Sequence, residues 1–132
     1  MGVTFLLDTH VFLWLLGEPD KVPDPIAAEL GDTQNTILVS AVSAMEVAIK
    51  VRLGKLDAAR HVVPTWAQRV ADIGAEELAL TSAHALLAGS LTWANRDPFD
   101  RLLVGQAIGD NLTLVTTDAT VAAMPGISVI TW

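Results

Sequence analysis

Hydrophobic residues along this chain fall into two alternating kinds of segment. Five short apolar runs have the length and composition of strands buried on both faces, at residues 3–7, 36–39, 78–80, 113–115 and 128–130. Between them, apolar residues recur at helical spacing at residues 11–16, 25–30, 43–53, 65–73, 83–91 and 98–109. This alternation predicts a single α/β domain over residues 1–132, with a central parallel sheet of about five strands flanked by helices.

Capping signals predict where several helices begin. Asp97 stands before a proline, which is the usual order at a helix start. Ser43 with Glu46, and Thr65 with Gln68, have the spacing of capping boxes, in which a side chain bonds back to the start of its helix. We therefore expect helices to begin at these positions.

Five acidic residues are predicted to gather at one edge of the sheet, where the carboxyl ends of parallel strands meet and where such folds place their sites. They are Asp8, Glu46, Asp97, Asp100 and Asp118. Four also have structural interpretations: Glu46 as a capping-box acid, Asp97 and Asp118 as N-caps, and Asp100 as a first-turn acid. Asp8 is an isolated charge between two apolar segments, where an acid without a partner is costly.

Composition narrows the chemistry of such an acidic cluster. The chain has no cysteine, which excludes disulfides, thiolate zinc sites and cysteine nucleophiles. Crowded carboxylates repel one another, and a divalent cation relieves that repulsion. Oxygen ligands without a regular histidine pair favour Mg²⁺, or Mn²⁺, over zinc. Because such an ion activates water and polarises phosphoryl groups, phosphodiester hydrolysis is the predicted reaction class.

The charge balance bears on possible partners. Eight Lys and Arg stand against 15 Asp and Glu, a net charge of −7, which disfavours a general nucleic-acid coat or a polybasic membrane binder. Three cations near the acidic motifs, Lys50, Arg96 and Arg101, are candidates for contacts with substrate phosphates. The alternative is a solvated helix face, and Lys50 also stands one turn after Glu46, where the two can pair.

Hydrophobic residues make up 52 % of the chain and charged residues 17 %, which excludes a disordered chain. So few charges cover the surface sparsely, so we expect apolar patches that contact partners. No apolar run has the length of a membrane span, and the first residues lack the basic region of a signal peptide. A soluble cytoplasmic protein is predicted.

Four short motifs occur in order along the chain: LLDTHVFLW, SAVSAMEVAIKVRLGKL, RDPFDRLLVGQA and LVTTD. In that order they resemble the motifs of PIN-domain ribonucleases, and most closely those of VapC-type toxins of bacterial toxin–antitoxin pairs. The resemblance covers essentially the whole chain. It implies a PIN-like fold and Mg²⁺-dependent endonucleolytic cleavage of RNA, in which water attacks phosphorus in line and expels the ribose 3′ oxygen.

The resemblance also implies a role for each acid. The catalytic acids of the family correspond to Asp8, Glu46, Asp100 and Asp118. All but Glu46 would hold the metal, with Asp97 in support, and Glu46 would orient or deprotonate the attacking water. Thr9 and Thr116 resemble the hydroxyls that orient the carboxylates.

This sequence departs from the related subgroup at three positions. Met45 stands where tryptophan often precedes the middle glutamate, Asn95 where histidine often precedes RDPFD, and Gly105 where alanine is usual. None of these changes removes an acid, so the predicted activity stands. Asn95 lies at the mouth of the predicted site, where it bears on substrate handling.

The partners implied by the resemblance are an RNA substrate, a VapB-like antitoxin and a second copy of the chain as a homodimer. We expect the antitoxin groove along residues 11–16 and 43–53. Two alternatives are a catalytically inactive PIN-like interaction module and a phosphotransferase with Asp8 as nucleophile. The intact set of acids argues against the first, and His10, standing where such enzymes usually carry a second aspartate, argues against the second.

Overall fold

The computed structural model describes residues 2–132. In this part of the chain five strands form one sheet: β1 (Thr4–Leu7), β2 (Thr36–Ser40), β3 (Glu76–Leu78), β4 (Thr113–Val115) and β5 (Ser128–Ile130). The order across the sheet is β3-β2-β1-β4-β5, and every neighbouring pair is parallel. The predicted α/β fold with a five-stranded parallel sheet is therefore confirmed.

Within the described residues, seven α-helices connect and cover these strands. They are α1 (Thr9–Gly17), α2 (Asp24–Gly31), α3 (Ala41–Arg52), α4 (Trp66–Asp72), α5 (Ser82–Ser90), α6 (Pro98–Gly109) and α7 (Ala119–Ala122). Residues 2–132 also contain three single turns of 3-10 helix, at Pro19–Lys21, Asp57–Ala59 and Val63–Thr65. Within residues 2–132, no helix is both long enough and apolar enough to cross a membrane.

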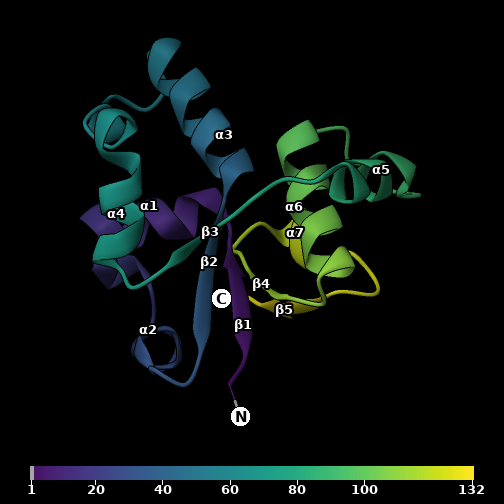
Figure 1. Ribbon diagram of the computed structural model, residues 1–132, viewed down its shortest axis with the longest axis horizontal. Coiled ribbons are helices and arrows are strands. Elements are labelled where there is room, and N and C mark those ends of the chain that lie inside the picture. The colour runs from purple at the N-terminus through teal and green to yellow at the C-terminus, as the bar shows by residue number, and fades with distance from the viewer. Residues whose placement is uncertain (1) are drawn as a thin grey trace.

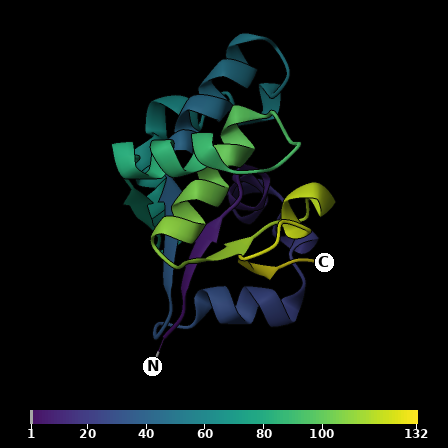
Figure 2. The same cartoon turned by 90° about the vertical axis from the view of Figure 1, so that its right-hand side faces the viewer.

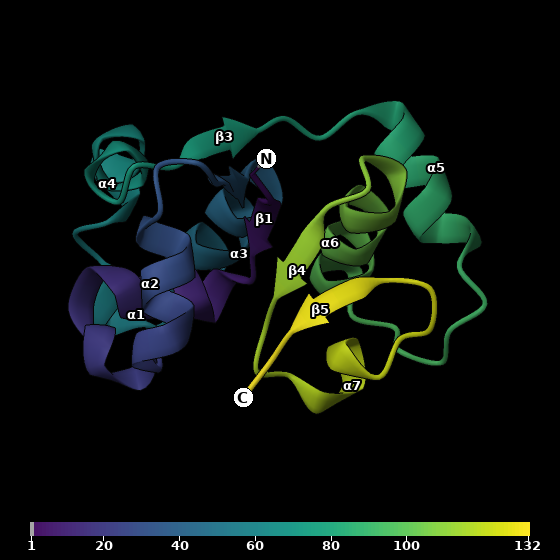
Figure 3. The same ribbon diagram turned by 90° about the horizontal axis from the view of Figure 1, so that it is seen from below.

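The sheet separates two hydrophobic cores. Helices α1, α2 and α4 lie on one side of it and α5, α6 and α7 on the other, as Figures 1 and 3 show. Successive side chains of a strand point to opposite faces. Phe5 and Leu7 of β1 therefore pack with α1, α2 and α4, whereas Leu6 between them packs with α6 and α7. This two-sided burial explains why β1 has no polar residue after Thr4.

The edge strand β3 begins two residues before the predicted run. Its residues Glu76 and Glu77, which point to opposite faces, are both exposed, and β3 lies at the edge of the sheet beside β2. An edge strand tolerates charged side chains that a central strand excludes. Because these two residues are charged, the prediction from continuous apolar runs placed this strand at residues 78–80.

Two predicted capping boxes are wrong. Helix α3 begins at Ala41, because the Ser40 side chain accepts from the Val42 N–H, so Ser43 lies inside the helix. The Thr65 hydroxyl donates to the carbonyl of His61 and does not cap α4. A capping box does form at the start of α5, where the histidine three residues after Thr81 takes the place of the usual Glu or Gln.

Close packing of α5 against α6 fixes the position of α6. The two helices lie side by side in Figure 2. A Cβ atom on Gly105 of α6 would lie 2.9 Å from the Ala88 Cβ and 2.9 Å from the His84 carbonyl oxygen of α5. Real Cβ atoms do not approach so closely, so glycine at this position lets the helices meet. The departure at Gly105 thus has a packing reason.

Candidate active site

A pocket of about 310 Å³ opens near the carboxyl ends of β1 and β4. Connections leave these neighbouring strands toward opposite faces of the sheet, and at such a switch point α/β folds form a crevice. The pocket is lined by His10, Trp14, Lys50, Thr117 and all five acids singled out above: Asp8, Glu46, Asp97, Asp100 and Asp118. Tertiary structure therefore brings together acids that lie up to 110 positions apart in the sequence.

Asp8 occupies the first residue after β1. Its backbone N–H donates to the Val115 carbonyl of β4 at 2.9 Å, so the sheet itself places it. The hydroxyl of buried Thr116 donates to the Asp8 Oδ2 at 2.5 Å and accepts from the Asp118 N–H at 3.1 Å. Burial raises the pKa of Asp8, although the Thr116 hydrogen bond and nearby His10 oppose that rise.

Glu46 is held at both of its carboxylate oxygens. The Thr9 hydroxyl donates to Oε1 at 2.6 Å, and the Lys50 ammonium lies 2.6 Å from Oε2, one helical turn along α3. Thr9 Oγ1 also lies 2.8 Å from the hydroxyl of Ser43. These bonds satisfy a carboxylate that is only 7 % exposed. The capping-box interpretation of Glu46 is therefore wrong.

Asp97 and Asp118 both cap helices, as their structural interpretation proposed. Asp97 Oδ1 accepts from the Phe99 and Asp100 N–H groups at the start of α6. Asp118 Oδ1 accepts from two N–H groups at the start of α7. Each cap uses Oδ1, so a structural role does not prevent Oδ2 from binding a ligand. Both residues are exposed at the pocket.

Asp100 lies in the first turn of α6 and is half-buried. The amide of Asn95 donates to its Oδ2 at 2.9 Å. Desolvation raises the pKa of Asp100 to about 6, the Asn95 bond opposes the rise, and the negative charges of Asp97, Asp118 and Asp8 add to it. The pocket thus holds carboxylates whose mutual repulsion the protein itself relieves only in part.

These side chains match a hard divalent cation in ligand type and in charge. The five acids offer carboxylate oxygens, the ligands that Mg²⁺ and Mn²⁺ prefer. Within residues 2–132, however, no three His, Asp or Glu side chains lie close enough together to hold an ion as they stand. Binding would therefore draw the carboxylates inward from their present positions.

The three basic residues predicted to contact phosphates have different surroundings. Lys50 lines the pocket, and its ammonium is bonded to Glu46, as the helical spacing suggested. Arg96 is exposed and immediately precedes the pocket residue Asp97 in the sequence. Arg101 is half-buried, and its guanidinium donates to four backbone carbonyls, including those of Leu91 and Asn95.

Three pocket residues, His10, Trp14 and Thr117, were given no site role from the sequence. His10 and Trp14, from α1, line the acidic pocket, with their rings 6.3 Å apart. His10 is exposed, and it lies near enough to Asp8 to oppose the rise in the pKa of that carboxyl. The sequence could have pointed to His10 through its position, because it lies two residues after Asp8, on a helix that begins at the site.

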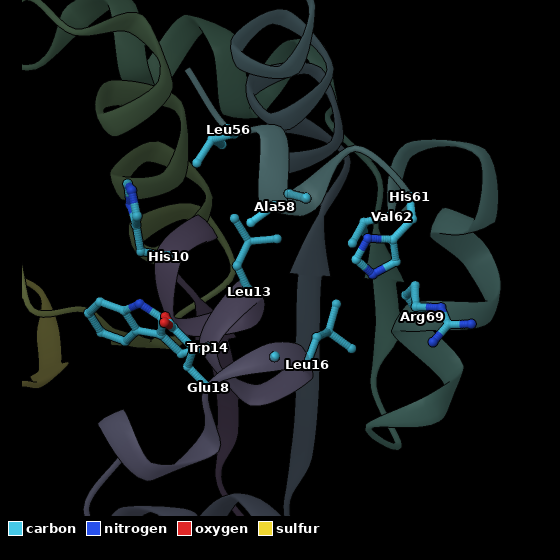
Figure 4. Close-up of a pocket in the computed structure, with 12 residues that line it drawn as sticks. His10, Leu13, Trp14, Leu16, Glu18, Leu56, Ala58, His61, Val62 and Arg69 are labelled. Atoms are coloured by element: carbon cyan, nitrogen blue, oxygen red, sulfur yellow. The ribbon is translucent and has the colours of Figure 1, made fainter. Parts of the chain in front are cut away.

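A second hollow, of about 440 Å³, adjoins the acidic pocket through the shared residues His10 and Trp14. Figure 4 shows aliphatic side chains, among them Leu13 and Leu16, between those two residues at one end and His61 with Arg69 at the other. We call it the α1 groove. It is lined by residues of α1, by residues between 56 and 62, and by Arg69.

The family model of the PIN domain matches residues 5–127, and the chain belongs to the PIN domain family. It is 30 % identical over 116 residues to ribonuclease VapC22 of Mycobacterium tuberculosis, a match that covers 87 % of each chain. The resemblance to VapC-type PIN domains, predicted from the sequence motifs, is therefore confirmed.

Solved structures share the fold. The chain matches VapBC2 of Rickettsia felis, bound to a promoter DNA fragment, with a TM-score of 0.70, 19 % identity, and coverage of 98 % of this chain and 99 % of that one. DNA-bound VapBC of Salmonella typhimurium matches with a TM-score of 0.70, 21 % identity and 98 % coverage of both chains. FitAcB of Neisseria gonorrhoeae matches with a TM-score of 0.63, 17 % identity and 96 % coverage of both chains.

Proposed function

We propose that this protein is a Mg²⁺-dependent endoribonuclease that acts in the cytoplasm as the toxin of a toxin–antitoxin pair. The observation that carries the proposal is the acidic pocket, in which five carboxylates face one lysine that already pairs with Glu46. Its place at the switch point of a PIN fold and the similarity to a named ribonuclease support it. Mn²⁺ is an alternative to Mg²⁺ with the same ligand preference.

Each acid has a proposed role in this reaction. Asp8, Asp100 and Asp118 would hold the ion, with Asp97 in support. A bound Mg²⁺ supplies positive charge to the phosphoryl oxygens and acidifies a water ligand. Thr9 and Thr116 orient carboxylates, since each donates its hydroxyl to one.

Glu46 is the proposed acceptor of a proton from the attacking water. Thr9 and Lys50 each occupy one acceptor position on its two oxygens, and a carboxylate offers about four. Glu46 can therefore orient the water in a fixed direction and take its proton while the water oxygen bonds to phosphorus. The bond from phosphorus to the ribose 3′ oxygen then breaks, and that oxygen takes up a proton from solvent.

The proposed protein partner is a VapB-like antitoxin whose segment lies in the α1 groove. The aliphatic side chains of the groove fit the apolar side chains of such a segment, and the shared residues His10 and Trp14 lead from the groove to the acidic pocket. A basic side chain of that segment would be attracted to the carboxylates. We also propose that the chain forms a homodimer, which light scattering of the purified protein tests.

Cleavage of RNA by the purified, antitoxin-free protein tests the activity. Structured RNAs are incubated with wild type in Mg²⁺ and in EDTA, with Asp8→Asn, and with Asp20→Asn as the matched control on an exposed aspartate away from the pocket. We expect cleavage by wild type and Asp20→Asn in Mg²⁺ only. Asp8→Asn should lose roughly a thousandfold, because metal charge stabilisation is worth several kcal/mol. Equal cleavage in EDTA, or none in Mg²⁺, contradicts the proposal.

The α1 groove also fits an alternative function, that of a catalytically inactive PIN-like interaction module. A binding experiment, read together with RNA cleavage, distinguishes this module from the toxin ribonuclease. The probe is the product of a small reading frame upstream of this gene, which a toxin–antitoxin pair predicts. Ala58→Trp fills the groove from an exposed position, and Ala67→Trp adds the same bulk on exposed α4 outside it. We expect only Ala58→Trp to prevent co-purification. Capture without any RNA cleavage favours the interaction module.

A further inference from the structure

The loop of residues 91–97 between α5 and α6 is organised around one guanidinium group. Arg101, half-buried in the first turns of α6, donates four of its five N–H groups to backbone carbonyls. The acceptors are Ala88 at 3.1 Å, Leu91 at 2.6 Å, and Trp93 and Asn95 at 2.9 Å each. A loop without regular structure therefore has its path set by a single side chain.

The Asn95 side chain connects this loop to an acid of the pocket. Its Oδ1 accepts from the Asp97 N–H at 2.9 Å, and its Nδ2 donates to Asp100 Oδ2 at 2.9 Å. Because a backbone N–H can only donate, the first bond decides which end of the amide faces Asp100. One half-buried amide thus orients both the cap of α6 and the carboxylate one turn into it.

We infer that Asn95 is a positioning residue for Asp100 and that Arg101 holds Asn95 in place rather than contacting substrate. This inference rests on the proposed function, in which Asp100 holds a cation. A neutral amide suits that task, because it fixes a carboxylate oxygen without adding a positive charge that would compete with the cation. A lysine in its place would neutralise Asp100, as Lys50 neutralises Glu46.

Two kinds of measurement separate this role from a structural one. Mn²⁺ binding to the RNA-free protein by calorimetry reports on the acids directly, and kcat and KM for RNA cleavage report on catalysis and substrate contact. The matched control is Asn35→Ala, since Asn35 is also a half-buried loop asparagine, which accepts from Val3 N–H and donates to the Glu29 carbonyl away from the pocket.

For Asn95→Ala we expect Mn²⁺ affinity and kcat to fall about 10- to 100-fold, as for other groups that orient a metal ligand, with KM unchanged. Asn95→His should recover much of the loss, because a neutral imidazole also has one donor and one acceptor. Asn35→Ala should match wild type. An Asn95→Ala variant with wild-type Mn²⁺ affinity and kcat overturns the inference, as does a rise in KM alone.

Arg101→Lys distinguishes loop positioning from phosphate binding. If Arg101 positions the loop, amide hydrogen exchange in residues 91–97 speeds up and kcat falls, while the salt dependence of RNA binding stays as in wild type. If Arg101 contacts a phosphate, KM rises and the salt slope decreases by about one, which overturns its assigned role. A wild type that neither binds Mn²⁺ nor cuts RNA refutes the proposed function, whereas an active wild type with an unaffected Asn95→Ala refutes only this inference.

Discussion

The two sides of the acidic pocket differ in how their carboxylates are compensated. On the α3 side, buried Glu46 has a lysine at one oxygen and a threonine hydroxyl at the other. On the α6 side, half-buried Asp100 has only a neutral amide, and three further carboxylates add to the rise of its pKa. On the α3 side, groups of the protein itself therefore compensate the carboxylate charge. The second side is therefore where we expect a cation to bind.

The largest effect is expected where Lys50 is removed. Lys50→Met leaves Glu46 buried and charged without its cation, which should lower the free energy of unfolding by about 2–3 kcal/mol. Urea denaturation measures it, and adding Glu46→Gln should restore most of the loss. The control is Lys21→Met, whose pair with Glu18 is exposed and should cost under about 0.5 kcal/mol. Equal costs for the two lysines would remove the contrast between the two sides.

A divalent cation should stabilise the protein through the α6 side. At a Mn²⁺ concentration a hundredfold above Kd, the free energy of unfolding rises by about 2.7 kcal/mol over that in EDTA. Asp100→Asn should lose most of this gain, whereas Glu46→Gln should keep it, each variant being compared with its own value in EDTA. Denaturation curves with and without Mn²⁺ provide the measurement. Loss of the gain in Glu46→Gln would show that both sides bind the ion.

In the absence of metal, the same two substitutions should act in opposite directions. At pH 7 Asp100→Asn removes a desolvated charge facing other acids and should stabilise the protein by about 1 kcal/mol, solvent screening included. Glu46→Gln leaves Lys50 without its partner and should destabilise it. Thermal unfolding in EDTA compares the two with wild type. Destabilisation by Asp100→Asn would mean that repulsion does not dominate at this site.

The smallest expected effect concerns pH. The folded pKa of Asp100, about 6, lies above its ordinary value of 3.8, so the folded state binds the extra proton. This group's contribution to stability is full below pH 3.8 and is lost as pH rises through about 6. Between pH 4.5 and 6 the wild type in EDTA should lose about 0.5 kcal/mol to this group. Asp100→Asn should flatten the slope without abolishing it, because burial also raises the pKa of Asp8.

Much of the fold could be predicted because its central strands are buried on both faces. The runs at residues 113–115 and 128–130 match β4 and β5, and the helix predicted at residues 98–109 matches α6. The prediction was displaced at edge strand β3, where Glu76 and Glu77 are both exposed, and failed where two capping patterns fit by spacing alone. A capping box needs a helix that starts at its first residue, and Ser40 starts α3 three residues before Ser43.

For the candidate site, the sequence by itself determined which acids stand at strand ends and helix starts, because residue type and local spacing specify both. Only the tertiary structure decided whether a neighbouring group compensates the charge of each acid. Whether a carboxylate is neutralised, as Glu46 is by Lys50, or left among other acids, as Asp100 is, depends on groups brought together by the sheet. The same holds for Arg101, whose charge suggested a phosphate contact but whose N–H groups bind carbonyls of the preceding loop. Hydrogen-bond partners follow from three-dimensional distance, which spacing along the chain does not encode.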